Sequence, residues 1–117
     1  MSHQSQLDFV ASLKKSHPQY FSQKRVLEIG SLDINGSIRQ FFEGCTYIGV
    51  DLGEGKGVDL VAKGEELTFP DDGFDVVVSC ECFEHNPEWI ATFNNMARMC
   101  NGLVIMTCAT TGRPEHG

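Results

Sequence analysis

The sequence has no apolar run approaching the roughly 20 residues that a membrane-spanning helix needs. Its first residues, MSHQSQLDFV, lack the basic-then-apolar layout of a secretory leader. Basic residues are few, with no cluster longer than Lys14-Lys15 or Lys24-Arg25, and the formal net charge is −7. Because an acidic surface repels phosphate backbones, we expect neither a membrane nor a nucleic acid as the main partner.

The cysteines lack the spacing of a zinc knuckle or of a disulfide framework. The five are Cys45, Cys80, Cys82, Cys100 and Cys108, an odd and unpatterned set in apolar surroundings. Such a set is typical of reduced thiols in a cytosol-like compartment, so we expect a cytoplasmic protein. We interpret Cys80 and Cys82 as buried thiols within a strand and expect no metal site.

The length of 117 residues suffices for one domain with a single core, and the chain has no internal repeat. We therefore expect one domain over residues 1–117, with an N-terminal helix within 1–22 and a core over 25–109. Apolar Leu7, Val10 and Leu13 recur at helical spacing near the start. Pro18 follows them and favours an end to that helix.

Five short apolar runs predict strands at residues 26–29, 47–50, 58–62, 74–79 and 103–108. Strands this uniformly apolar are typical of a parallel sheet that helices cover on both faces. A helix is expected from about residue 36 to 42. Another should begin at Asn86-Pro87, place Ile90, Phe93, Ala97 and Cys100 on one stripe and stop at Asn101-Gly102. We predict a Rossmann-like α/β fold: a doubly wound, mostly parallel sheet of about five strands.

The segment VLEIGSLDINGSIR, residues 26–39, carries the clearest indication of a binding site. An apolar strand ends with Glu28 and Gly30, and Gly36 precedes the next expected helix. Glycine allows the backbone to approach a ligand closely, and a helix start offers free N–H groups. In open α/β sheets, ligands bind at this end of the strands.

The segment YIGVD places Asp51 at the end of the next strand, where a carboxylate can accept hydrogen bonds from two ribose hydroxyls. The glycine spacing, Gly30 to Gly36, does not match the G-x-G-x-x-G fingerprint of dinucleotide sites. A pyrophosphate is also disfavoured beside Glu28, whereas a cationic amine or sulfonium is favoured there. We therefore expect a nucleoside that carries positive charge.

From about Arg25 to Ala109 the sequence resembles the class I S-adenosylmethionine-dependent methyltransferases, in particular the small-molecule branch often called type 11. Glu28, Gly30 and Gly36 match the family's first motif, and Asp51 matches its acidic second-strand end. Residues 69–85, FPDDGFDVVVSCECFEH, look like its fourth-strand motif. The resemblance implies S-adenosylmethionine as cofactor and the following cofactor-binding residues: Glu28, Gly30, Ser31, Gly36, Asp51, Leu52, Gly64, Glu65 and Glu81.

Two departures from the family pattern bear on the cofactor. The loop of residues 31–35 lacks the second glycine that is commonest there. Lys63 stands where an acidic residue usually accepts from the adenine amine, and lysine cannot accept a hydrogen bond. Adenine would then depend on the backbone near Gly64 and Glu65.

The resemblance implies methyl transfer to a small-molecule acceptor, which the sequence does not identify. No catalytic residue can be named, because Glu84-His85 is better interpreted as a polar turn than as an acid–base pair. The alternatives are a non-catalytic or fragmentary methyltransferase-like binding module and, less favoured, a nicotinamide-dependent oxidoreductase. The matched segment stops after the fifth strand, as expected of a truncated or minimal domain. An apolar edge at 103–106 then predicts a homodimer or higher homo-oligomer.

Overall fold

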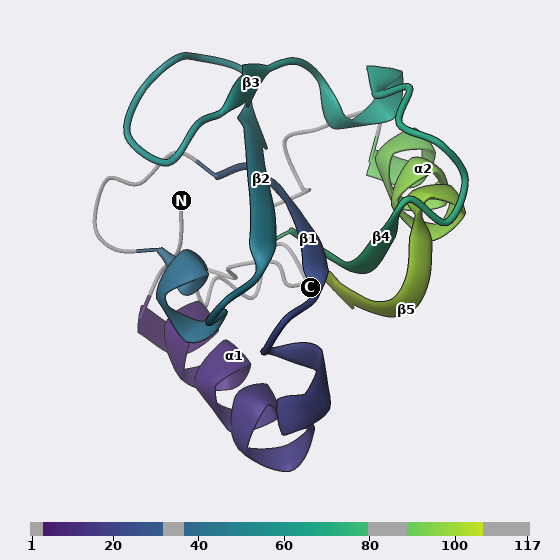
Figure 1. Ribbon diagram of the computed structural model, residues 1–117. Helices are drawn as coiled ribbons and strands as arrows, with labels where there is room; N and C mark the ends of the chain where they lie inside the picture. Colours follow the sequence, from purple (N-terminus) through teal and green to yellow (C-terminus); the bar gives the residue numbers. More distant parts are fainter. Residues whose placement is uncertain (1–3, 32–36, 80–88, 107–117) are drawn as a thin grey trace, which may run out of the picture.

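The computed structural model describes residues 4–31, 37–79 and 89–106, and its centre is one sheet of five parallel strands (Figure 1). The strand order is β3-β2-β1-β4-β5, and all four pairings are parallel. The strands are β1 (Arg25–Ile29), β2 (Thr46–Asp51), β3 (Leu60–Val61), β4 (Phe74–Ser79) and β5 (Cys100–Met106). The predicted Rossmann-like α/β sheet is confirmed, because order and direction match a doubly wound fold.

The register brings the carboxyl ends of the central strands to the same edge of the sheet. Ile29, the last residue of β1, lies opposite Val50 of β2 and Ser79 of β4. Val50 in turn pairs with Leu60, at the start of the short β3. Residues that follow β1, β2, β3 and β4 therefore meet along one edge, which we call the carboxyl edge.

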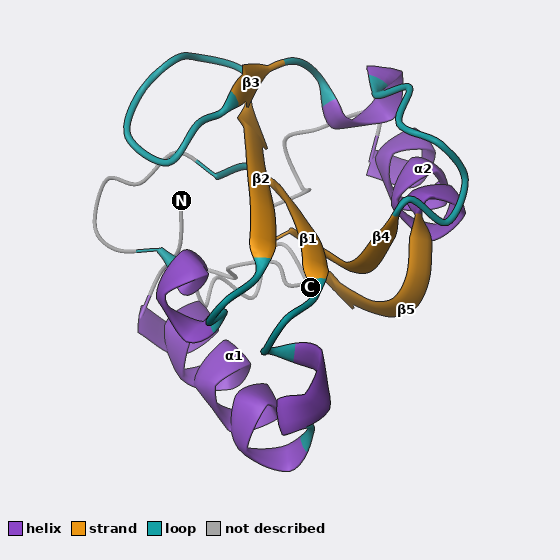
Figure 2. Ribbon diagram, viewed as in Figure 1, coloured by secondary structure: helices purple, strands orange, loops and turns teal. Residues whose placement is uncertain are grey.

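One helix packs on each face of the sheet (Figure 2). Helix α1 (Gln4–Ser16) places Val10 against Val26 on one face, whereas α2 (Trp89–Met99) places Met96 against Leu27 on the other. Successive residues of a strand point to opposite faces, so neighbours in β1 serve the two separate cores. The prediction of helices on both faces is confirmed. No helix in the described part of the chain is long and apolar enough to span a bilayer.

Three short 3₁₀ helices complete the fold: η1 (Pro18–Tyr20), η2 (Ile38–Phe41) and η3 (Gly64–Glu66). The helix expected over residues 36–42 is therefore only the single turn η2. Ser37 precedes it with extended backbone, and its Oγ accepts a hydrogen bond from the Arg39 N–H at 3.1 Å. Extended backbone at Phe42 ends the turn, so no longer helix forms here.

The buried stripe expected on α2 is wrong. Within residues 90–99 of this helix, Thr92, Met96 and Met99 are buried, whereas Ile90 and Phe93 are 57% and 40% exposed. Ala97 is also exposed, and Cys100 opens β5 rather than ending the helix. The expected N-cap at Asn86-Pro87 lies outside the described residues.

Polar contacts to residues 64–69, in η3 and the segment between η3 and β4, explain which face of α2 is buried. The Asn95 amide donates to the carbonyl oxygens of Gly64 and Leu67, at 2.8 and 3.0 Å. The Arg98 guanidinium donates to the carbonyl oxygens of Leu67 and Phe69, at 3.2 and 2.8 Å. Satisfying these loop carbonyls fixes the rotation of the helix, because unpaired backbone carbonyls are costly to bury.

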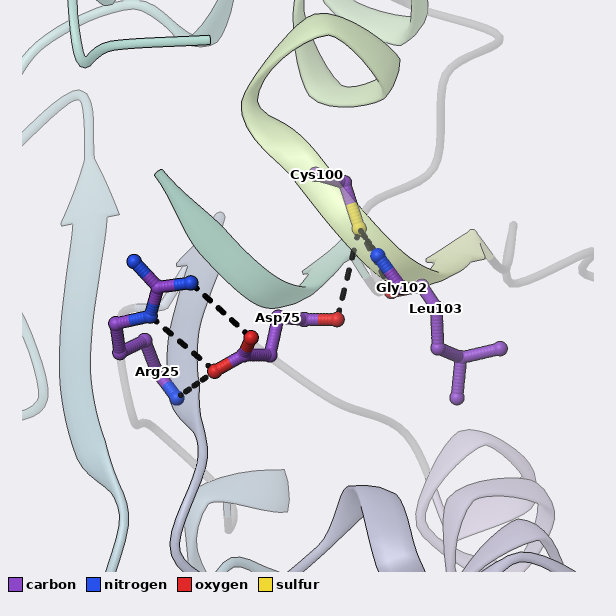
Figure 3. A network of polar contacts seen from close by, with 5 residues as sticks. All are labelled: Arg25, Asp75, Cys100, Gly102 and Leu103. Carbon is purple, nitrogen blue, oxygen red and sulfur yellow. Dashed lines mark hydrogen bonds and ion pairs between the residues drawn. The ribbon is translucent and has the colours of Figure 1, made fainter. Parts of the chain in front are cut away.

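A polar network ties the strands together at the opposite, amino end of the sheet (Figure 3). The Arg25 side chain makes two hydrogen bonds to the Asp75 carboxylate, at 3.1 and 3.2 Å, and thereby joins β1 to β4. The Cys100 thiol donates to the Leu103 carbonyl oxygen at 3.3 Å and accepts from the Gly102 N–H. The dipeptide 101–102, expected to stop a helix, instead lies inside β5. A Cβ at Gly102 would come within 2.4 Å of the Asp75 carbonyl oxygen.

Candidate functional site

The loop that leaves β1 folds over the end of β2. The N–H groups of Gly30 and Ser31 both donate to the Val50 carbonyl oxygen, at 2.7 and 3.0 Å. Gly30 adopts a φ of 82°, a conformation that glycine reaches at little cost. This turn carries Ser31 to the carboxyl edge, where its side chain is buried and its Oγ has no hydrogen-bond partner in the described structure.

Gly49 allows this loop to come close to β2. A Cβ at position 49 would lie 2.2 Å from the Gly57 carbonyl oxygen and 2.6 Å from the Ser31 Oγ. Both the first loop and the loop before β3 therefore press onto the backbone of β2. The sequence analysis did not single out Gly49, although a glycine inside an apolar strand often marks such a close approach.

Glu28 lies inside β1 rather than at its tip, opposite Gly49 and Val78, and is 1% exposed. Its Oε1 accepts a hydrogen bond from the Tyr47 hydroxyl at 2.6 Å. Burial raises the pKa of Glu28 to about 7, and the negative charge of Asp51 adds to the rise. The Tyr47 hydrogen bond and nearby positive charge, that of Arg39 included, oppose the rise.

A network that the sequence analysis missed surrounds this carboxyl group. The Arg39 guanidinium lies over the Tyr47 ring, 4.6 Å from its centroid, and donates to the Tyr47 carbonyl oxygen. It also pairs with Asp59 at 2.9 Å. The Gly49 N–H donates to the same carboxylate oxygen at 2.8 Å and is the main reason why the pKa of Asp59 is lowered. The network links β1, η2, β2 and the start of β3.

Asp51 ends β2 at the carboxyl edge, as predicted. Its Oδ1 accepts from the N–H of Leu52 at 2.7 Å, which fixes the orientation of the carboxylate. The Asp51 carbonyl oxygen accepts from the Ala62 N–H at 3.0 Å, so β3 lies alongside. Leu52 is 70% exposed next to this carboxylate. Asp51 lies near enough to Glu28 for its negative charge to raise the pKa of Glu28.

The segment after β3 packs against the end of β1. Gly64 is buried, and a Cβ there would meet the Ile29 and Thr92 methyl groups at 3.0 Å. The Glu65 Oε1 accepts from the Thr92 hydroxyl at 3.3 Å, so this side chain is held by α2. Lys63, immediately before η3, is exposed.

Ser79 closes the carboxyl edge on the β4 side. It lies opposite Ile29, is fully buried, and its Oγ lacks a partner among the residues described. The carboxyl edge thus gathers seven of the nine predicted site residues: Glu28, Gly30, Ser31, Asp51, Leu52, Gly64 and Glu65. Gly36 and Glu81, as well as Glu84-His85, Cys80 and Cys82, lie outside the described residues.

A family model described as a methyltransferase domain matches residues 2–115. The chain belongs to this family. The match spans nearly all of the 117 residues, including every strand and both α-helices described above. A search of curated proteins finds no match.

Solved structures with the same fold include methyltransferases. One is the 1,6-didemethyltoxoflavin-N1-methyltransferase of Burkholderia thailandensis, with bound 1,6-didemethyltoxoflavin and S-adenosylhomocysteine: TM-score 0.64, 18% identity, covering 85% of this chain and 50% of that one. Another is an S-adenosylmethionine-dependent methyltransferase from Archaeoglobus fulgidus: TM-score 0.57, 24% identity, covering 80% and 47%. The methyltransferase domain described here therefore spans about half the length of these solved chains.

Proposed function

We propose that this methyltransferase domain binds S-adenosylmethionine at its carboxyl edge and takes part in methyl transfer to a small-molecule acceptor. The observation that carries the proposal is the placement of Asp51 and Glu28 beside the glycine turn at Gly30. S-adenosylmethionine offers two ribose hydroxyls to a carboxylate. The amine and the sulfonium of its methionine part carry positive charge. The edge supplies an acceptor for the first and negative charge for the second.

The residues present fit such a ligand on independent grounds. The Ser31 and Ser79 hydroxyls are buried at the edge without partners in the described part of the chain. Buried hydroxyls are normally hydrogen-bonded, so these two are suited to bind a polar group of a ligand at the carboxyl edge.

Binding and orientation are the tasks that this chain's own residues perform. Asp51 would hold the ribose, the turn at Gly30 and Ser31 would hold the methionine part, and the backbone at Gly64 would face the adenine. The bound cofactor itself supplies an electrophilic methyl group. Methyl transfer to a good nucleophile depends mainly on proximity and orientation, so the proposal names no catalytic base. The 1,6-didemethyltoxoflavin bound in the Burkholderia structure supports an acceptor of small-molecule size.

Calorimetric titration with S-adenosylhomocysteine tests the proposal. We expect saturable binding by the wild type and at least about tenfold weaker binding by Asp51→Asn, because one charge-assisted acceptor is lost. Asp72→Asn is the matched control. Asp72 is exposed at the turn before β4, away from the carboxyl edge, with a φ of 56° that asparagine tolerates. Equal affinity in both variants, or preference for NAD, would refute the proposed site.

A non-catalytic binding module is the second candidate. Lys63 supports it, because an exposed ammonium beside the proposed adenine position can only donate hydrogen bonds. Incubation with methyl-labelled S-adenosylmethionine and a pool of small metabolites separates the candidates. A labelled product favours the enzyme, whereas tight binding without any labelled product favours the module.

A further inference from the structure

Glu28 is the only acidic side chain in the described structure that is fully buried. A carboxylate withdrawn from water needs compensating charge or several hydrogen bonds to remain ionised. The Tyr47 hydroxyl supplies one short hydrogen bond, at 2.6 Å. The β4 residue opposite Glu28 is Val78, which offers no polar group.

The charged groups around Glu28 do not fully offset the cost of burying its ionised carboxylate. The positive charge of Arg39 lowers the pKa of Glu28, but the Arg39 guanidinium is already paired with Asp59 at 2.9 Å. Asp51, from the end of β2, adds a second negative charge to the same region. Two carboxylates that share a region disfavour joint ionisation, so a proton on one of them relieves the repulsion.

We propose that Glu28 is partly protonated in the ligand-free domain at neutral pH and releases this proton to solvent when a cationic ligand binds at the carboxyl edge. The inference rests on the proposed function, because it takes the ligand to be an adenosine derivative with a positively charged amine or sulfonium. That charge would offset the repulsion from Asp51. Breaking the O–H bond of Glu28 then leaves a carboxylate facing a cation, and the proton passes to the buffer.

The linkage has a definite sign. Burial raises the pKa of Glu28 to about 7, so near neutrality the free domain is a mixture of protonated and ionised forms. A cation binds the ionised form better, and reciprocity requires that binding lowers this pKa. Affinity should therefore rise with pH up to about 7 and level off above it. Below that value affinity should fall by up to about tenfold per pH unit.

Calorimetry of S-adenosylhomocysteine at pH 7 in two buffers of different ionisation enthalpy measures the protons exchanged. We expect the wild type to release about half a proton per ligand bound, and Glu28→Gln to release none. Glu54→Gln, which removes an exposed carboxylate, should match the wild type. Equal proton release from the wild type and Glu28→Gln would overturn the inference.

A second variant keeps the test decisive if Glu28→Gln does not fold. Tyr47→Phe removes the hydrogen bond that holds the pKa of Glu28 down, so proton release at pH 7 should rise towards one. Its affinity should also level off at a higher pH. Tyr20→Phe, at the other tyrosine, should leave both values unchanged. Binding without these changes overturns the linkage alone, whereas no binding at any pH overturns the proposed function as well.

Discussion

At the scale of single residues, burial of Glu28 has a consequence for stability that needs no ligand. Its pKa rises from 4.5 to about 7 on folding, so the folded state holds its proton more tightly than the unfolded state. The contribution to stability is therefore complete below pH 4.5 and is lost as the pH rises towards 7. Relative to Glu28→Gln, the wild type should lose on the order of 3 kcal/mol across this interval. Urea unfolding of both proteins from pH 4 to 8 measures it, and a constant difference would contradict the prediction.

Gly49 offers a second residue-scale prediction. In Gly49→Ala, the new Cβ meets the Gly57 carbonyl oxygen at 2.2 Å and the Ser31 side chain at 2.6 Å, so two loops must move. We expect a loss of about 1–3 kcal/mol in unfolding free energy, the usual cost of overpacking. Gly53→Ala is the matched control, because no atom lies within 4 Å of its added Cβ. Similar denaturation midpoints for the two variants would show that the loops adapt freely.

The sequence predicted where the candidate site residues after the strands lie, but not the residues that contact and support them. Gly30 and Asp51 are local features of a strand end, and a parallel sheet necessarily brings such ends together. Tyr47, Arg39 and Asp59 act through contacts between different elements, and no spacing in the sequence reveals which partner each will meet. Glu28 was placed at the strand tip because its burial depends on the neighbouring strands.

At the scale of elements, strands were predicted better than helices. Apolar runs located all five described strands, most clearly β1 and β4, because a strand buried on both faces needs apolar residues throughout. The buried face of α2 was predicted wrongly. Asn95 and Arg98 donate hydrogen bonds to loop carbonyl oxygens, and a hydrophobic pattern does not reveal such contacts. The shortness of η2 was missed for a related reason, since its boundaries depend on hydrogen bonds at Ser37 and Phe42.

At the scale of the whole molecule, the sheet has a different kind of strand at each edge. At one edge β3 has only two residues, both exposed, and short edge strands resist pairing with other chains. At the other edge β5 has seven residues and is paired on one side, with β4, in the part of the chain that the structure describes. A longer apolar edge strand is the better template for pairing. We therefore propose that the domain self-associates through β5.

A lysine substitution in each outermost strand, β3 or β5, tests this proposal, because a charge on an edge strand disfavours pairing with another strand. Val104 of β5 is partly exposed, so a lysine stem can lie along the surface with its ammonium in water. We expect the wild type to give a mass above that of the monomer in light scattering, and Val104→Lys to shift it towards the 12.9 kDa monomer. Val61→Lys, on the exposed β3 edge, should keep the wild-type mass. A monomeric wild type at all concentrations, or equal dissociation by both variants, would count against β5 as the interface.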